Sequence, residues 1–377
     1  MKTAYPFPSR SSGAMDQTVS GGTPSSDGFT LVELLVAMAV LAMFVVLMAQ
    51  LLESASQASR SSGKRTDADS QARMVFDRMA GDLSRMVRRP DADCLFYKNT
   101  NNASDVMYFY SEGPAYFTNT NSAGASNNGT VSLIGYRVAT NAMYTNNPVL
   151  ERLGKGLYWT NAASTNIPIF LTTPSGSAIP TNPSTLAGNW ASLLGTAAGG
   201  YTNTTDTNCF QTLGDLVCRM EIQFLLTDGT VSDRPILSNA PGNWPTGPTF
   251  FNATTSDPAT TSATPTYTTG SRWWNSSTQR GYLCTSAASN AAVWSPIGTR
   301  DVTALVVTLA ILDATSRKII PAGTAINGTA LADSSSSNPV ATSWMSAVTN
   351  SSFAGSLGIP RAAASQVRIF QRTFPLQ

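Results

Sequence analysis

The chain has 377 residues, a formal net charge of +2 and no histidine. Because histidine is the commonest general base near neutral pH and the commonest metal ligand, Ser-His-Asp, Cys-His and His-metal chemistry are excluded. Charged residues make up 12% of the chain, compared with about 25% in typical soluble proteins, so the composition is typical of an extracytoplasmic, β-rich protein and gives no electrostatic footprint of a nucleic-acid binder.

The first predicted element is a membrane-spanning helix over residues 31–52. A helix rising about 1.5 Å per residue covers the ~30 Å hydrocarbon core of a bilayer over this length, and residues 34–52 carry no charge. A secretory signal peptide has its small-residue cleavage site after the apolar segment, whereas Gly28 stands before it. Cleavage at Gly28 would remove a polar leader and keep the helix. Cleavage after the apolar run, near Ser54-Ala55-Ser56, is the alternative.

Glu33 is the one charged residue within this segment. Inserting an ionisable side chain into a membrane helix costs on the order of 2.5–3.5 kcal/mol at mid-helix and less near the interface. The presence of Glu33 in this segment therefore requires a physical explanation. One reason is local, because Thr30 and Glu33 have the spacing of a capping box, in which two side chains satisfy free backbone N–H groups. The other is a charge pair with a second chain, most naturally through the new amino terminus that cleavage creates at Phe29.

The residues Gly28-Phe29-Thr30-Leu31-Val32-Glu33, followed by a hydrophobic helix, resemble the class III leader of type IV prepilins and of type II secretion pseudopilins. The resemblance implies cleavage between Gly28 and Phe29 by a membrane prepilin peptidase/methyltransferase, with N-methylation of Phe29. It also implies that Glu33 guides assembly by meeting the N-terminal amine of a neighbouring pilin or pseudopilin subunit. The implied location is the bacterial inner membrane, crossed once, with the head in the periplasm or on an extracellular filament.

A second helical signal continues this helix. Apolar residues recur at alternating spacings of four and three, at Ala72, Phe76, Met79, Leu83 and Met86. Pro90 follows and ends the run. The sequence predicts one long helix from Phe29 to about Arg89, weakened near residues 61–63, whose second half packs on a globular domain.

Residues 60–89 also carry an excess of arginine. Arginines that neutralise phosphates supply most non-specific affinity for nucleic acid. The alternative is the solvated face of a surface helix, with i,i+4 pairs such as Asp69 with Arg73. We favour the solvated face and expect no nucleic-acid partner, because no aromatic residues interleave with the arginines to stack on bases.

After residue 90 the signals are those of strands. Six segments are rich in β-branched, aromatic and aliphatic residues: 106–110, 131–138, 149–158, 218–226, 304–312 and 366–374. The dipeptide Asp228-Gly229 is typical of a hairpin turn. Several of these strands are expected to form one antiparallel sheet that the amphipathic helix covers, an α+β fold. Long polar tracts separate the strands, at residues 118–130, 160–207, 252–271 and 321–356.

The predicted organisation has four parts. Residues 1–28 form a cleaved leader, residues 29–53 a transmembrane or filament-core helix, and residues 54–90 an amphipathic helix that continues into the head. Residues 91–377 form a β-rich globular head with Ser/Thr/Asn-rich insertions.

Four cysteines are candidates for disulfides: Cys94, Cys209, Cys218 and Cys284. An exported protein tends to oxidise them, and four cysteines permit three connectivities, with free buried thiols as the alternative. No CxxC spacing indicates a zinc site. Asp67 and Asp69 begin like a calcium loop, but Ala72 stands where its sharp turn needs glycine. We therefore expect no metal, no cofactor and no catalytic residue.

Aromatic residues gather around Cys284, at Arg272-Trp273-Trp274, Tyr282 and Trp294. On a surface, such rings could stack on sugar or peptide rings and make an adhesive site. Burial in a small β subdomain, with a disulfide at Cys284 as an added constraint, is the plainer interpretation and the one we favour.

Further short motifs resemble the J-type minor pseudopilins of type II secretion. They are residues 77–83, 88–90, 135–138, 150–153 and 224–229, in the family's order. The C-terminal residues 367–374 resemble the prepilin-like family called Verru_Chthon cassette protein C. These resemblances imply a minor pilin or pseudopilin at or near a filament tip, without enzymatic activity. The alternative is a tip adhesin or DNA-uptake pilin whose head binds carbohydrate or DNA.

Overall fold

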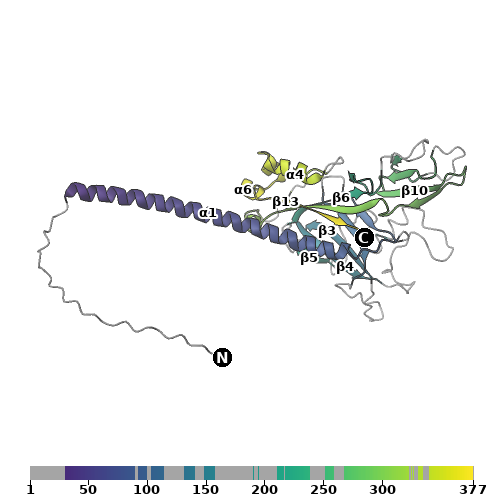
Figure 1. Ribbon diagram of the computed structural model, residues 1–377, viewed down its shortest axis with the longest axis horizontal. Helices are drawn as coiled ribbons and strands as arrows, with labels where there is room; N and C mark the ends of the chain where they lie inside the picture. The colour runs from purple at the N-terminus through teal and green to yellow at the C-terminus, as the bar shows by residue number, and fades with distance from the viewer. Residues whose placement is uncertain are drawn as a thin grey trace, which may run out of the picture. The chain divides into compact units, whose positions relative to one another are not determined.

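The computed structural model describes residues 30–89, 92–99, 103–113, 131–140, 148–157, 190, 194, 210–215, 217–237, 251–258, 267–321, 324, 326, 330–333 and 339–376. The chain divides into two compact units, Met1–Arg60 and Ser61–Gln377. Helix α1 (Leu31–Leu83) begins in the first unit and ends in the second, which we call the head (Figure 1). A long N-terminal helix followed by antiparallel sheets confirms the predicted α+β class.

Five antiparallel strands form one sheet of the head, which we call the meander sheet. In order across the sheet they are β1 (Leu95–Tyr97), β2 (Val106–Ser111), β3 (Ser132–Thr140), β4 (Pro148–Gly156) and β5 (Phe210–Gly214). Consecutive strands are neighbours throughout, which is the simplest connection for antiparallel strands. The sheet contains three of the six predicted strands.

A second, four-stranded sheet, which we call the central sheet, contains the other three predicted strands. Its order is β13 (Arg368–Pro375), β12 (Val302–Ile311), β6 (Val217–Leu226) and β7 (Val231–Ser232). β12 lies between β6 and β13 and is antiparallel to both. The predicted turn at Asp228-Gly229 joins β6 to β7, and Gly229 has a φ of +84°, in the region that glycine adopts without steric cost.

Two inserts add structure that the sequence had not predicted. Between β7 and β12 lies a small sheet of β11 (Val293–Pro296), β10 (Arg280–Ser286), β9 (Arg272–Asn275) and β8 (Phe251–Thr254). Between β12 and β13 the described residues include the helices α3 (Ala314–Arg317), α4 (Val340–Thr349), α5 (Phe353–Leu357) and α6 (Arg361–Ala364). The tracts 252–271 and 321–356 are thus not loops throughout. In α4 the buried Val340, Ala341 and Trp344 supply an apolar face within a polar sequence.

The main core of the head lies between α1 and the two larger sheets. All five predicted stripe residues of the helix are buried, which confirms the amphipathic pattern: Ala72, Phe76, Met79, Leu83 and Met86. They pack against Met107 and Phe109 of the meander sheet and against Ile222 and Leu305 of the central sheet, among others. Each fully buried large apolar side chain contributes roughly 1.5–3 kcal/mol, so this stripe fixes the helix to the head.

Strand alternation gives each sheet a second buried face. In β2, Met107 and Phe109 face α1, whereas Val106, Tyr108 and Tyr110 face a separate cluster that contains Trp190. The central sheet is covered on its other face by the inserted helices, among which Trp344 of α4 is fully buried. Figure 1 shows α4 and α6 on one side of β13 and β6.

Helix α1 ends earlier than predicted. It is continuous through residues 61–63, where weakening was expected, but stops at Leu83 rather than near Arg89. Met86 forms an isolated antiparallel bridge with Ser111, and the Val87 N–H donates to the carbonyl of Tyr110 at 2.8 Å. The C-terminal end of β2, which β1 does not cover, therefore pairs with the backbone that would have extended the helix.

A buried polar contact joins the last helical turn to the meander sheet. The Asp82 carboxylate accepts from Nε and Nη2 of Arg152 at 2.6 and 2.9 Å, and from the phenol of Tyr136. Burial, reinforced by the Asp82 charge, raises the pKa of Tyr136 well above its usual value, so the phenol stays protonated and donates. Removing one partner of such a buried pair typically costs about 3–5 kcal/mol.

A second polar network links β1, β6 and the segment before α4. The Lys98 ammonium lies 3.0 Å from Asp105 and 2.8 Å from Glu221. Arg219 lies 3.1 Å from Glu221 and also pairs with Asp333. These five residues form a chain of alternating charges with a carboxylate at each end, which we call the charge chain. Burial, together with the neighbouring Glu221, raises the pKa of Asp105 to about 7, although Lys98 opposes the shift.

Gly135 in β3 is required by close packing. A Cβ at this position would lie 2.3 and 2.4 Å from two ring carbons of Tyr108, which is fully buried and cannot retract. We expect Gly135→Ala to lower the free energy of unfolding by about 1–3 kcal/mol, measured by thermal or denaturant unfolding of the full chain in detergent. Gly81→Ala is the control, because Gly81 lies in α1 with nothing within 4 Å of an added Cβ; it should stabilise by about 0.5–1 kcal/mol. Equal stability of the Gly135 variant would contradict the packing.

Asp105 should make the head less stable as the pH rises. Its pKa in the folded state, about 7, lies above the ordinary value of 3.8, so the folded state holds a proton that the unfolded state has lost. The resulting stabilisation is complete below about pH 4 and disappears as the pH rises through 7. Unfolding of wild type should show a decline on the order of 2–4 kcal/mol over this window, and Asp105→Asn should remove it. Asp228→Asn, an exposed carboxylate, should leave the decline unchanged; a decline that persists in Asp105→Asn would refute this assignment.

Candidate functional site

The first turn of α1 carries the predicted capping box. The backbone N–H and the hydroxyl of Thr30 donate to Oε2 of Glu33 at 3.1 and 3.2 Å, and the Glu33 N–H donates to the Thr30 hydroxyl at 3.3 Å. Two of the backbone N–H groups that a helix start leaves without intrahelical partners are thereby satisfied. The local interpretation of Glu33 is confirmed.

The same geometry leaves Glu33 able to make a second contact. Oε2 accepts both hydrogen bonds from Thr30, and no described residue donates a hydrogen bond to Oε1. Glu33 is exposed, as are Thr30 and the residues that follow. One carboxylate oxygen can therefore cap the helix while the other accepts from a cation outside the unit. The two interpretations of Glu33 are physically compatible.

Behind the cap, α1 presents an apolar surface on all sides. Large apolar side chains are exposed from Leu31 at 81% to Leu52 at 71%. Among the described helices, α1 is the one that is long and apolar enough to cross a membrane, and its most apolar window is wholly exposed within the chain itself. Contiguous apolar surface of this size is unfavourable in water, so residues 31–52 require lipid or other apolar helices around them.

Gly28 and Phe29 lie outside the described residues, so cleavage and N-methylation at this junction stay predictions. Cys209 lies outside them as well. Cys94, Cys218 and Cys284 are free and form no disulfide with one another; pairings with Cys209 stay a prediction.

The three described thiols are not activated nucleophiles. Burial raises the pKa of Cys94 and of Cys218 to about 12, and it also raises the pKa of Cys284. The Cys218 thiol donates to the carbonyl of Ala310 at 3.1 Å. Because the thiolate is the reactive form of cysteine, these groups stay protonated and inert at neutral pH.

The aromatic residues around Cys284 are largely buried in the small sheet, as favoured from the sequence, with Trp274 in one small cluster and Trp294 beside Cys284 in another. Trp274, Tyr282 and Cys284 are buried, and Trp273 and Trp294 are half-buried. Trp294 packs edge-on against the rings of Tyr267 and Trp273, with centroids 4.9 and 6.0 Å apart. These contacts use the rings for packing within the small sheet.

Two arginines of the basic segment 60–89, Arg78 and Arg88, have structural partners. Arg88 donates to the carbonyls of Leu376, Thr299 and Val302 at 2.9–3.0 Å, and so holds the C-terminal segment. Arg78 lies 3.9 Å from Asp82, as an i,i+4 pair on the helix. Asp67 and Asp69 lie on the continuous helix, and within the described ranges no three His, Cys, Asp or Glu side chains group as metal ligands.

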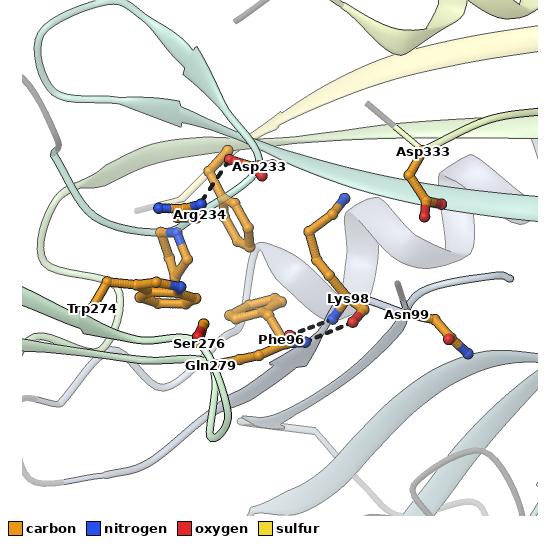
Figure 2. Close-up of a pocket in the computed structure, with 11 residues that line it drawn as sticks. Phe96, Lys98, Asn99, Asp233, Arg234, Trp274, Ser276, Gln279 and Asp333 are labelled. Carbon is orange, nitrogen blue, oxygen red and sulfur yellow. Dashed lines mark hydrogen bonds and ion pairs between the residues drawn. The ribbon is translucent and has the colours of Figure 1, made fainter. Parts of the chain in front are cut away.

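A second candidate site is a pocket in the head that the sequence did not predict. Its volume is about 250 Å³, and its walls include Phe96 of β1, Phe224 of β6, Trp274 of β9 and Asp333 (Figure 2). Gln279 closes one side by a double hydrogen bond with the backbone of Lys98, each 2.6 Å. These residues are far apart in the sequence, so no local pattern could have indicated the pocket.

Comparison with protein-family models gives one finding. The family described as "Prokaryotic N-terminal methylation motif" matches residues 24–49, which include the capping box and most of the exposed apolar segment. Comparisons with curated proteins and with solved structures give no match. The motif supports a type IV pilin- or pseudopilin-like protein with a class III leader, and the one long apolar helix found among the described residues fits a membrane anchor that crosses the bilayer once.

Proposed function

We propose that the protein is a minor pilin or pseudopilin, a structural subunit of a type II secretion-like or type IV pilus-like filament, placed at or near its tip. The observation that carries the proposal is the exposed apolar helix of residues 31–52 behind the Thr30–Glu33 capping box, inside the matched methylation motif. A helix that is apolar on every side is suited to a bundle of like helices. The work of the protein is assembly, without a reaction of its own.

Maturation follows from the position of the motif. A prepilin peptidase/methyltransferase cuts between Gly28 and Phe29, removes residues 1–28 and methylates the new terminus. Residues 29–53 stay in the inner membrane as the anchor, and the head lies in the periplasm or on an extracellular filament. Because the cut precedes the apolar segment, processing exposes a positively charged amine without losing the anchor.

Assembly uses the two charges at the start of the helix. The Phe29 amine of one subunit meets the Glu33 carboxylate of its neighbour, and residues 34–52 of both pack together. In a low-dielectric environment an unpaired carboxylate is costly, and an opposite charge offsets that cost. Thr30 donates both of its hydrogen bonds to Oε2 of the carboxylate, which supports an intermolecular contact through Oε1.

The second candidate, an adhesin or DNA-uptake pilin, would need exposed aromatic rings or arginines. Trp274 and Tyr282 are buried, and Arg88 is bound to three backbone carbonyls. These contacts favour structural roles for the aromatic cluster and for Arg88, and we do not propose that activity.

The mature N-terminus tests the maturation step. Mass spectrometry of the purified membrane protein should find a chain that begins at Phe29 and carries one additional methyl group. Gly28→Leu should retain the leader, because the small residue at the cut is lost, whereas Gly22→Leu within the leader should be processed normally. A mature chain that begins after Leu52 would refute the proposal, since no anchor would remain.

The role of the Glu33 charge can be separated from its role as a cap. A glutamine side chain at this position can still complete the capping box but carries no charge, so both Glu33→Gln and Glu33→Ala should insert into the membrane yet lower incorporation into filaments at least about tenfold, the effect of losing ~1.4 kcal/mol. The measurement is the ratio of sheared or secreted to membrane-bound protein. Glu53→Gln, at the other end of the apolar segment, is the matched control and should assemble normally. Normal assembly of Glu33→Gln would show that capping alone matters.

A further inference from the structure

The turn between α4 and α5 carries an Asn-X-Ser triplet at the surface of the head. Asn350 follows the last residue of α4, and Ser351 and Ser352 lead into α5. All three residues are exposed. Asn-X-Ser/Thr, with any residue except proline in the middle, is the acceptor triplet for N-linked glycans in exported proteins. Its use depends on access to the asparagine and on whether the amide nitrogen is already engaged.

Buried side chains hold this turn at the surface. Trp344 of α4 and Phe353 of α5 are 1% and 4% exposed, and both belong to the core between the inserted helices and the central sheet. The Asn350 N–H donates to the carbonyl of Ala347 at 3.0 Å, and the Phe353 N–H donates to the carbonyl of Asn350 at 3.1 Å. The backbone is therefore anchored on both sides of the triplet, while its three side chains stay in solvent.

The side-chain amide of Asn350 has its oxygen engaged and its nitrogen available. Oδ1 accepts from the backbone N–H of Ser352 at 3.1 Å and from the Ser352 hydroxyl at 3.0 Å. No described residue accepts a hydrogen bond from Nδ2 of Asn350. Because the hydroxyl polarises the amide carbonyl, the N–H protons become more acidic, and one of them must leave when the nitrogen forms a new bond. The serine of the triplet thus assists its asparagine.

A second triplet, Asn275-Ser276-Ser277, has the same sequence and the opposite environment. Asn275 is 3% exposed. Its Nδ2 donates to Oδ1 of Asp257 at 2.9 Å, and its Oδ1 accepts from two backbone N–H groups, one of them that of Ser277. The nitrogen is both buried and engaged. Folding alone therefore separates two identical triplets, because it leaves Asn350 accessible and encloses Asn275.

We propose that Asn350 is a modification site that accepts an N-linked glycan. The donor is an oligosaccharide carried on a polyprenyl diphosphate, and a separate membrane transferase catalyses the step. Nδ2 of Asn350 forms a C–N bond to the anomeric carbon of the sugar. The bond from that carbon to the diphosphate oxygen breaks, and polyprenyl diphosphate leaves with the bonding electrons. One amide proton passes to a base of the transferase, and nothing is oxidised or reduced.

Glycosylation of Asn350 rests on the proposed function, because the transferase meets the head only after the head is exported across the inner membrane. An N-linked glycan is bulky and polar. The turn between α4 and α5 therefore stays in solvent when subunits assemble, and subunit contacts use other surfaces of the head.

Peptide mass spectrometry of the full chain isolated from its native cells tests the proposal. Chymotrypsin cuts after large aromatic residues and releases peptides 345–353 and 275–282, in which Asn350 and Asn275 are the sole asparagines. Peptide 345–353 should carry the mass of a glycan and yield sugar fragments, whereas peptide 275–282 should be unmodified. An unmodified peptide 345–353, or equal modification of both peptides, would overturn the proposal.

Three variants locate the sugar within peptide 345–353. Asn350→Gln and Ser352→Ala should each remove the glycan, the first because the acceptor is lost and the second because the assisting hydroxyl is lost. Ser351→Ala, at the middle position, is the matched control and should be glycosylated like wild type. All three positions are exposed, so each variant should unfold at a temperature close to that of wild type. A glycan that persists in Asn350→Gln would lie on a serine or threonine and refute the proposal.

Protease added to spheroplasts separates failure of this site from failure of the proposed function. A head that has crossed the inner membrane should be digested, and a head in the cytoplasm should be protected. A digested head without a glycan at Asn350 would overturn the glycosylation alone, whereas a protected head without a glycan would overturn both proposals.

Discussion

The structure depends on one constraint: α1 carries an apolar surface that its own chain does not cover. Residues 31–52 are exposed around the whole helix, whereas the buried stripe from Ala68 to Leu83 faces the head. Apolar burial scales with area at roughly 25 cal/mol per Å², so the second part is stabilised by folding and the first requires lipid or other helices. The capping box at Thr30 and Glu33 satisfies backbone N–H groups at the helix start, where a membrane or a bundle offers little water to do so.

Charges in the head are few, and many of them are buried in pairs. Arg152 with Asp82 ties the helix to the meander sheet, Arg137 lies opposite its partner Glu151 across β3 and β4, and Arg272 pairs with Asp301 between the small sheet and the start of β12. A buried pair adds little net stability, but a shifted register would leave its charges without partners at a cost of several kcal/mol. We infer that these pairs select one arrangement of the strands.

The inserts between β7 and β12 and between β12 and β13 explain the length of the head. Each returns to a strand of the central sheet, so that sheet forms although large segments interrupt its sequence. The inserted helices cover the second face of the sheet through Trp344 and its neighbours. The small sheet contributes Trp274 to the pocket, and the central sheet contributes Phe224. The pocket thus exists only because the first insert is present.

The sequence by itself determined the features that depend on local order: the apolar segment, the capping box, the stripe from Ala72 to Met86 and six strands, because periodicity and spacing are properties of neighbouring residues. It also indicated the core role of the aromatic residues near Cys284. It did not determine the end of α1, where the edge of β2 captures Met86 and Val87, or the helix α4 within a polar tract. The division into three sheets, the charge chain and the pocket were decided by the tertiary structure alone, since they join residues such as Phe96, Phe224 and Asp333 that only folding brings together.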